Sequence, residues 1–174
     1  MCASINHKQM SENFSHLFPS QDQLSNLLEC YQTGKYEDAE KLAISLTLSF
    51  PKHQFAWKVL GAILEQTGRN SEAVNANQKA VALSPQDAQA YYNLGNIGYD
   101  LGHAYLRSDA YNSAYNLYTK AIEKNKNKAI YYSARAIAGM ETDIKNVCED
   151  LKTGFTLGDR KSISDYDIDF WCNL

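Results

Sequence analysis

The stretch FAWKVLGAILEQTGRNSEAVNANQKAVALSP, residues 55–85, contains the pattern that decides the fold. Its first half places Trp57, Leu60 and Leu64 on one face of a predicted helix, because residues three and four apart share a helical face. Gly68 follows at the expected end of this helix, where glycine adopts a left-handed backbone without steric cost. Alanines at helical spacing in the second half predict a second helix that packs closely against the first.

The same pattern recurs along the chain with a period of 34 residues. This spacing separates the members of three sets: Gly34, Gly68 and Gly102; Pro51 and Pro85; Ala39 and Ala73. Agreement among three residue types indicates an internal repeat rather than a coincidence. Ser84 is the predicted N-cap of the next copy, with Pro85 in the first turn of its helix.

The segment resembles the tetratricopeptide repeat, a 34-residue helix pair. The residues that match its pattern are Trp57, Leu60, Gly61, Leu64, Gly68, Ala73, Ala80 and Pro85, whereas Asn77 stands where an aromatic residue is usual. Four copies cover about residues 21–160, and the fourth has Tyr131 or Tyr132 in its leading aromatic position. The resemblance implies an all-α fold, an α-solenoid of about four helix pairs in a right-handed superhelix with a C-terminal capping segment.

The third copy is longer than the others. Twelve residues separate Gly102 from Ala114, where five separate the matching glycine and alanine in the first two copies. Seven extra residues are about two helical turns, so a longer first helix would keep its buried face in place. An expanded loop is the alternative, but Leu101, Ala104 and Tyr105 continue the apolar stripe and favour the helix.

The extent of the repeats divides the chain into three predicted segments. Residues 1–19 are expected to form a flexible N-terminal tail, and residues 161–174 a cap over the last helix pair. The repeat array between them covers 20–160, with copies at about 20–53, 54–87, 88–127 and 128–160.

Composition excludes several classes of protein. The net charge of −3 over 174 residues offers no basic face for nucleic acid, and no apolar run is long enough for membrane insertion. The four cysteines form no CxxC pair, which indicates reduced thiols rather than a disulfide framework, and hence a cytoplasmic protein.

The sequence contains no recognisable motif for catalysis or metal binding. The chain has no phosphate-binding glycine loop and no GxSxG elbow, and its four histidines are scattered. We therefore expect no enzyme activity, no catalytic residues, no metal site and no cofactor.

The resemblance implies a concave groove, lined by the first helix of each copy, that binds a peptide. By position in the repeat, the groove-facing residues are Leu24, Leu28, Tyr31, Phe55, Lys58, Ala62, Glu65, Gln89, Tyr92, Asn96, Tyr99, Tyr132 and Ala136. From these we select Lys58, Glu65, Tyr92, Asn96, Tyr99 and Tyr132 as candidate binding residues. Tyrosines at these positions suit an interface because they combine apolar area with a hydrogen-bonding tip.

The expected function is that of a scaffold or adaptor with a protein or peptide partner. The alternative is a targeting or regulatory module of a glycosyl- or sulfotransferase-type enzyme, because similar arrays precede such domains. Self-association through the ends of the helix stack is a further alternative. Binding of a chaperone's terminal carboxylate is disfavoured, because Ala62 stands where that site needs an asparagine.

Overall fold

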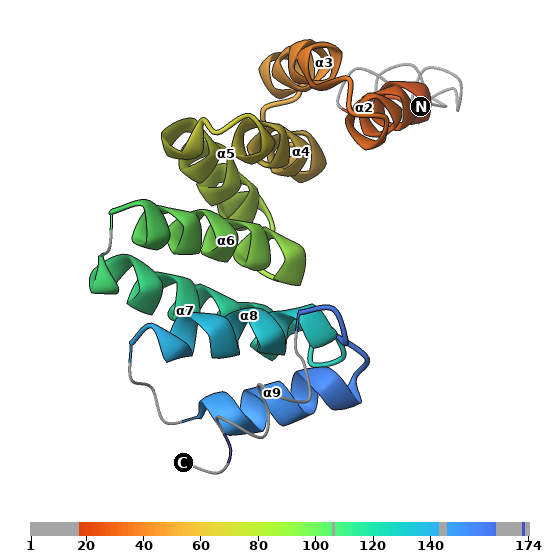
Figure 1. Cartoon of the computed structure of the whole chain (residues 1–174). Coiled ribbons are helices and arrows are strands. Elements are labelled where there is room, and N and C mark those ends of the chain that lie inside the picture. Colours follow the sequence, from red (N-terminus) through yellow and green to blue (C-terminus); the bar gives the residue numbers. More distant parts are fainter. Residues whose placement is uncertain (1–17, 106, 143–145, 163–171, 173–174) are drawn as a thin grey trace, which may run out of the picture. The chain divides into compact units, whose positions relative to one another are not determined.

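The computed structural model describes residues 18–105, 107–142, 146–162 and 172 of the chain. In these residues it contains helices and no strand (Figure 1). The helices are α2 (Gln21–Gln32), α3 (Tyr36–Ser49), α4 (Gln54–Gln66), α5 (Asn70–Leu83), α6 (Ala88–Tyr105), α7 (Ser108–Lys124), α8 (Ala129–Met140) and α9 (Val147–Thr156). The all-α fold of successive helix pairs is thus confirmed.

Local sequence signals explain where several helices begin and end. The Ser20 side chain accepts a hydrogen bond from the Gln23 backbone, and the Gln23 side chain accepts one from the Ser20 backbone, so α2 starts with a capping box. Gly34 and Gly68 both have φ of 75° and end α2 and α4 in the left-handed region. The predicted turns at these two glycines are therefore correct.

The predicted N-cap of the third copy is wrong. Helix α6 starts at Ala88, and the carboxylate of Asp87 accepts hydrogen bonds from the backbone N–H groups of Gln89 and Ala90. Ser84 lies one turn earlier, in the connection that contains Pro85. Asp87 caps the helix because a carboxylate satisfies two N–H groups that have no partner within the helix.

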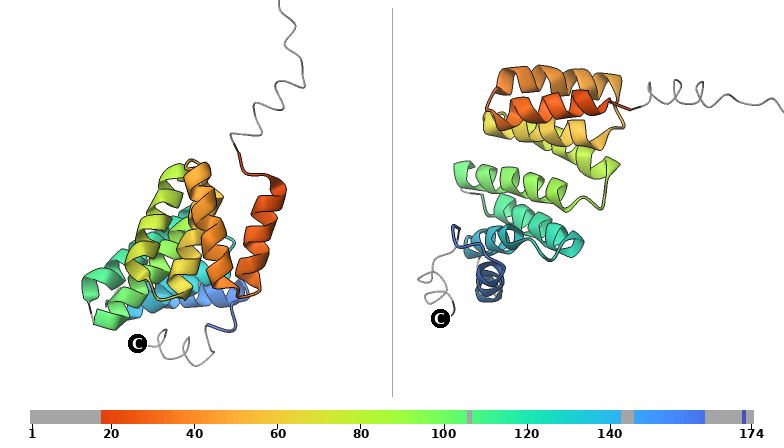
Figure 2. Two further views of the ribbon diagram at one scale, coloured as in Figure 1. Left: turned by 90° about the horizontal axis from the view of Figure 1, so that it is seen from above. Right: turned by 90° about the vertical axis from the view of Figure 1, so that its right-hand side faces the viewer.

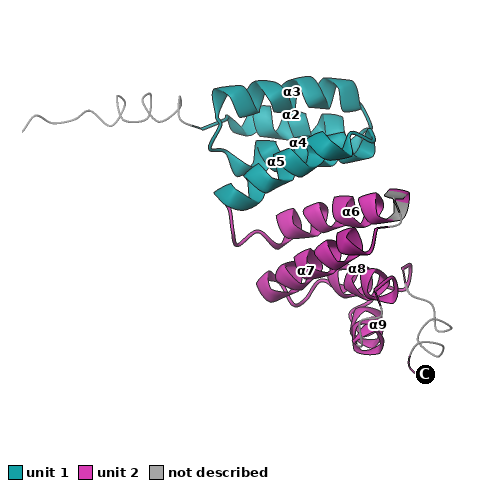
Figure 3. Cartoon of the chain, turned by 90° about the vertical axis from the view of Figure 1, so that its left-hand side faces the viewer, with its two compact units in different colours: residues 1–83 teal, residues 84–174 magenta. Residues whose placement is uncertain are grey.

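The chain divides into two compact units, residues 1–83 and 84–174 (Figure 3). In unit 1, α3 packs against α2 and α4, and α4 also packs against α5 and α2. In unit 2, α7 packs against α6 and α8, while α8 also packs against α9 and α6. Within each unit, the members of each pair run alongside one another, as the two views in Figure 2 show.

Small residues allow the helices of a pair to approach closely. Ala73 and Ala80 of α5 are completely buried, and a Cβ atom on Gly61 of α4 would collide with the Asn77 side chain. In unit 2, Tyr118 of α7 lies over Gly95 of α6 in the same way. Asn77 and Tyr118 are thus equivalent residues, and each requires a glycine on the facing helix.

The seven extra residues of the third copy lengthen both of its helices. Helix α6 has 18 residues against 13 in α4, and α7 has 17 against 14 in α5. Gly102 consequently lies inside α6 rather than at its end, which confirms the longer first helix favoured over an expanded loop. A Cβ atom at Gly102 would lie 2.8 Å from Cδ1 of Tyr111, so this glycine permits close packing of α7 on α6.

The expectation of reduced cysteines is wrong for one pair. Cys148 of α9 and Cys172 form a disulfide, and Cys30 is a free thiol. Spacing in the sequence did not predict this bond, because 24 residues separate its cysteines and their proximity depends on the fold. The predicted N-terminal tail up to residue 17, and most of the predicted cap, lie outside the described residues.

No helix in the described part of the chain is long and apolar enough to cross a membrane.

Candidate functional site

A pocket between α6 and α8 brings together three of the six candidate binding residues. Tyr92, Asn96 and Tyr99 lie at successive turns of α6, because residues three, four and seven apart share a helical face. The pocket has a volume of about 220 Å³ and is lined by Tyr92, Asn96, Tyr99, Tyr118, Ile130, Ala134, Ile137 and Ser162. We call it the α6–α8 pocket.

The two α6 tyrosines are held in place by other aromatic rings. The ring centre of Tyr92 lies 5.1 Å from that of Tyr131 and 5.8 Å from that of Tyr118. Tyr99 lies 5.4 Å from Tyr111, centre to centre. Burial, with a smaller contribution from the charge of Glu141, raises the pKa of Tyr99, so its hydroxyl is a neutral hydrogen-bonding group at physiological pH.

Asn96 adds a polar group to a pocket whose lining is otherwise mostly apolar or aromatic. The hydroxyl of Tyr118 donates a hydrogen bond to Oδ1 of Asn96, with 3.0 Å between the oxygens. This contact fixes one end of the carboxamide, and its Nδ2 group can donate to a ligand carbonyl. None of the eight lining residues is charged at neutral pH.

Lys58 and Glu65 belong to unit 1 and do not line the α6–α8 pocket. Both are half-buried on α4, seven residues apart. Burial and the negative charge of Glu65 raise the pKa of Tyr31 on α2, so Glu65 faces the first helix of the preceding copy.

Unit 1 has a pocket of its own at the corresponding position. It has a volume of about 210 Å³ and is lined by Gln21, Leu24, Ser25, Leu28 and Phe55, from α2 and α4. We call it the α2–α4 pocket. Leu24, Leu28 and Phe55 are among the groove-facing residues expected from the sequence, so the first helices of neighbouring copies form a pocket in each unit.

Tyr132 lies outside both pockets. It is half-buried against the cluster formed by Ala88, Ala121, Ile122 and Tyr131, and the Arg135 guanidinium lies 5.9 Å from its ring centre. Ala136, also expected in the groove, is completely buried.

Tyr132 and Ala136 were expected in the groove because the fourth copy was assigned one residue out of register. Ala56, Ala90 and Tyr131 are equivalent buried residues, separated by 34 residues and then by 41, which is 34 plus the insertion of seven. By the same count Ile130 corresponds to Phe55, and each of them lines a pocket. Counting the insertion through to α8 would have identified Ile130 and Ile137 as lining residues, whereas Ala134 corresponds to no groove-facing residue of the earlier copies.

Among the described residues, no three His, Cys, Asp or Glu side chains gather in a group that could hold a metal ion.

Known proteins resemble this chain in both sequence and fold. A family model described as TPR repeat matches residues 61–102. The peroxisomal targeting signal receptor of Kluyveromyces lactis is 25% identical over 147 residues, or 84% of the chain. The chain spans 22% of that receptor's length.

Two solved structures show the same fold. A thermophilic TPR protein of Thermus thermophilus superposes with a TM-score of 0.73, at 18% identity, over 86% of this chain and 82% of its own. The Yersinia enterocolitica type III secretion chaperone SycD, in complex with a peptide of the translocator YopD, has a TM-score of 0.58 at 18% identity over 71% of this chain and 88% of its own. Together with the 34-residue period and the paired helices, these matches show that the chain contains tetratricopeptide-type repeats and shares the fold of tetratricopeptide-repeat proteins.

Proposed function

We propose that the chain is a non-enzymatic protein-interaction module that binds a peptide, or an exposed segment of a partner protein, through the first helices of its copies. The observation that carries this proposal is the α6–α8 pocket, in which Tyr92, Asn96 and Tyr99 line one cavity. The α2–α4 pocket supports it, because the same helix faces build a second cavity in unit 1.

The lining of the α6–α8 pocket favours a peptide side chain without charge. Burying an ionised side chain among tyrosine rings, isoleucines and alanine would leave that charge uncompensated, which is costly. An apolar or aromatic side chain would instead gain contact with Tyr92 and Tyr99. Nδ2 of Asn96 is available to recognise a carbonyl oxygen of the peptide backbone.

A structural neighbour that is solved with a bound peptide is consistent with this role. We also propose that the protein acts as a scaffold or adaptor in the cytoplasm. Self-association through the ends of the helix stack remains a separate proposal, which light scattering at several protein concentrations would test.

Selection from a displayed library of random peptides tests the proposal without knowledge of the natural partner. Peptides enriched on the full chain should carry a recurrent apolar or aromatic residue, and calorimetry should measure their dissociation constants. We expect Ala134→Met, which fills the pocket from α8, and Tyr99→Ala to weaken binding by at least about 2 kcal/mol, or about thirtyfold.

Tyr91→Ala is the matched control. Tyr91 neighbours Tyr92 in sequence, but it does not line the pocket, and its ring lies 5.9 Å from Nζ of Lys120. Equal binding by Ala134→Met, Tyr99→Ala and the parent, with all three folded by circular dichroism, would contradict the proposed site.

A further inference from the structure

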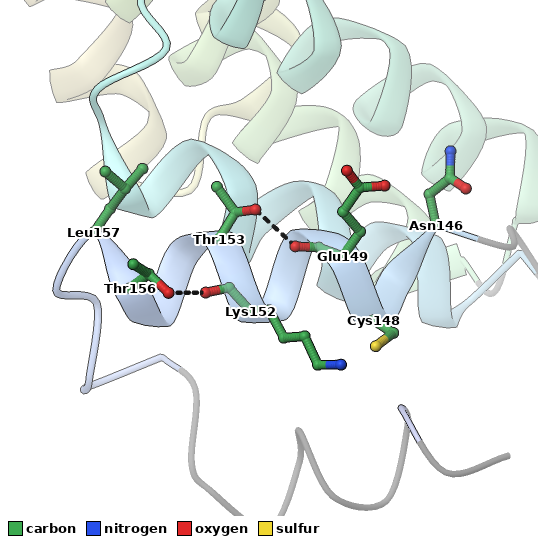
Figure 4. A pocket seen from close by; sticks show the side chains of 7 residues that line it. All are labelled: Asn146, Cys148, Glu149, Lys152, Thr153, Thr156 and Leu157. Carbon is green, nitrogen blue, oxygen red and sulfur yellow. Dashed lines mark hydrogen bonds between the residues drawn. The ribbon is translucent and has the colours of Figure 1, made fainter.

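The disulfide between Cys148 and Cys172 joins the last described helix to the C-terminal end of the sequence. Cys148 is the second residue of α9 and lines a pocket of about 580 Å³. Figure 4 shows the Cys148 sulfur and the Lys152 ammonium on the same side of α9. These two residues are four apart, which places them on one helical face.

The bond lies at the surface rather than in the core of unit 2. Cys172 is only half-buried, and the polar residues Lys152, Thr153 and Thr156 also line the pocket beside Cys148. In the cytoplasm, the location proposed above on which this inference rests, structural disulfides are rare, and those that occur are usually catalytic or respond to redox state. An accessible pair at a helix start is therefore suited to exchange with other thiols.

We propose that Cys148 and Cys172 are a reversible thiol–disulfide exchange site whose substrate is a dithiol reductant. A thiolate of the reductant attacks Sγ of Cys172, the bond between the two cysteines breaks, and Cys148 leaves as a thiolate. The second thiol of the reductant then attacks the reductant's first sulfur, which is bonded to Cys172 in the mixed disulfide. This step closes a disulfide within the reductant and releases Cys172. The two protons of the dithiol end on the two cysteines, and the reductant, which has lost two electrons, becomes a disulfide.

The geometry assigns Cys148 as the leaving group. The first N–H groups of α9 have no partner within the helix and stabilise a negative charge beside them, as does the nearby Lys152. The neighbouring Asp150 does not offset this effect fully, because its carboxylate is paired with Arg135. Glu149 also lines this pocket, but its side chain points away from those of Cys148 and Lys152 in Figure 4.

The full chain with Cys2→Ser and Cys30→Ser isolates the pair, since the sequence has four cysteines. We would equilibrate this protein with reduced and oxidised dithiothreitol in varying ratio. The protein would then be alkylated with N-ethylmaleimide under denaturing conditions, and its mass measured by mass spectrometry. Conversion from no added alkyl group to two, in one two-electron transition, is expected. A protein that stays fully reduced with oxidised dithiothreitol, or fully oxidised with a large excess of the reduced form, would overturn the proposal.

The rate of reduction tests the role of Cys148. Lys152→Met should slow reduction about threefold, because it removes a positive charge that stabilises the departing thiolate. Lys161→Met is the control, since Lys161 is exposed and lies beyond the end of α9. Equal rates for these two variants would overturn the assignment of Cys148 as the leaving group.

Discussion

Arg135 of α8 and Asp150 of α9 form a bidentate ion pair. Nε of Arg135 donates to Oδ2 of Asp150 at 2.7 Å, and Nη2 donates to Oδ1 at 2.6 Å. The side chain of Asp150 is 3% exposed and that of Arg135 is 18% exposed, so the pair is largely removed from water. Nη1 of Arg135 also donates to Oγ1 of Thr119, which connects α7 to the same pair.

Removing one member of this pair should destabilise unit 2 strongly. Arg135→Leu leaves the buried carboxylate of Asp150 without its partner, and we expect a loss of about 3 kcal/mol or more in the free energy of unfolding. Urea unfolding followed by far-UV circular dichroism measures this loss. Replacing both residues by leucine should recover much of the stability, because no unpaired charge then remains.

The exposed pair between Arg107 and Asp109 provides the control. Both side chains are more than 60% exposed, so water screens their attraction. Arg107→Leu should therefore leave the unfolding curve almost unchanged. A similar loss in Arg107→Leu and Arg135→Leu would show that burial of the α8–α9 pair is unimportant.

Replacing each of two glycines of α6 by alanine should have opposite effects on the stability of the fold. At Gly95 a Cβ atom would lie 2.6 Å from Cε1 of Tyr118, so we expect Gly95→Ala to cost about 1–3 kcal/mol. At Gly98 the nearest atom is Cβ of Ala114 at 3.6 Å, an ordinary contact, and Gly98→Ala should be neutral or stabilise by up to about 1 kcal/mol. Thermal unfolding of both variants measures the difference, and a greater loss in Gly98→Ala would contradict the described packing of α7 on α6.

The stability of the fold should fall at alkaline pH. Burial, with smaller contributions from the charges of Asp87 and Tyr92, raises the pKa of Tyr131, and burial also raises the pKa of Tyr99. Below pH 10 these tyrosines are neutral in both the folded and the unfolded chain. Above it they ionise first in the unfolded chain, so stability is lost as the pH rises through the folded pKa values.

Melting temperatures between pH 8 and pH 11 test this expectation. Tyr131→Phe removes one ionisable group and also the hydrogen bond from the Tyr131 hydroxyl to Oε1 of Gln89. The variant should therefore have a lower melting temperature than the parent at pH 8. Its melting temperature should fall less than that of the parent between pH 8 and pH 11. An identical decline in the variant and the parent would show that Tyr131 does not contribute to the alkaline loss.

The sequence predicted the repeat well where its 34-residue phase is unbroken. Gly34 and Gly68 end helices as expected, because a left-handed turn restricts the residue type locally. The pocket residues Tyr92, Asn96 and Tyr99 also follow from their spacing on α6. Local backbone demands and helical periodicity can both be read from one sequence.

Prediction failed where the answer depends on contacts between distant residues. The insertion lengthens α6 and α7 together, which moves Gly102 into a helix. The fourth copy was also assigned one residue out of register, so the expected Tyr132 lies outside the α6–α8 pocket, whereas Ile130 lines it. The disulfide of Cys148 was missed because the approach of Cys172 is a property of the folded chain.

Photo-crosslinking from within the α6–α8 pocket tests most directly whether this pocket is the peptide-binding site. A benzophenone amino acid would replace Tyr99 in one variant and Tyr91 in another, and each would be irradiated with a selected peptide bound. We expect position 99 to crosslink to the recurrent apolar residue of the peptide and position 91 not to, as read by mass spectrometry. Crosslinking from position 91 but not from position 99, with the peptide bound in both variants, would contradict it.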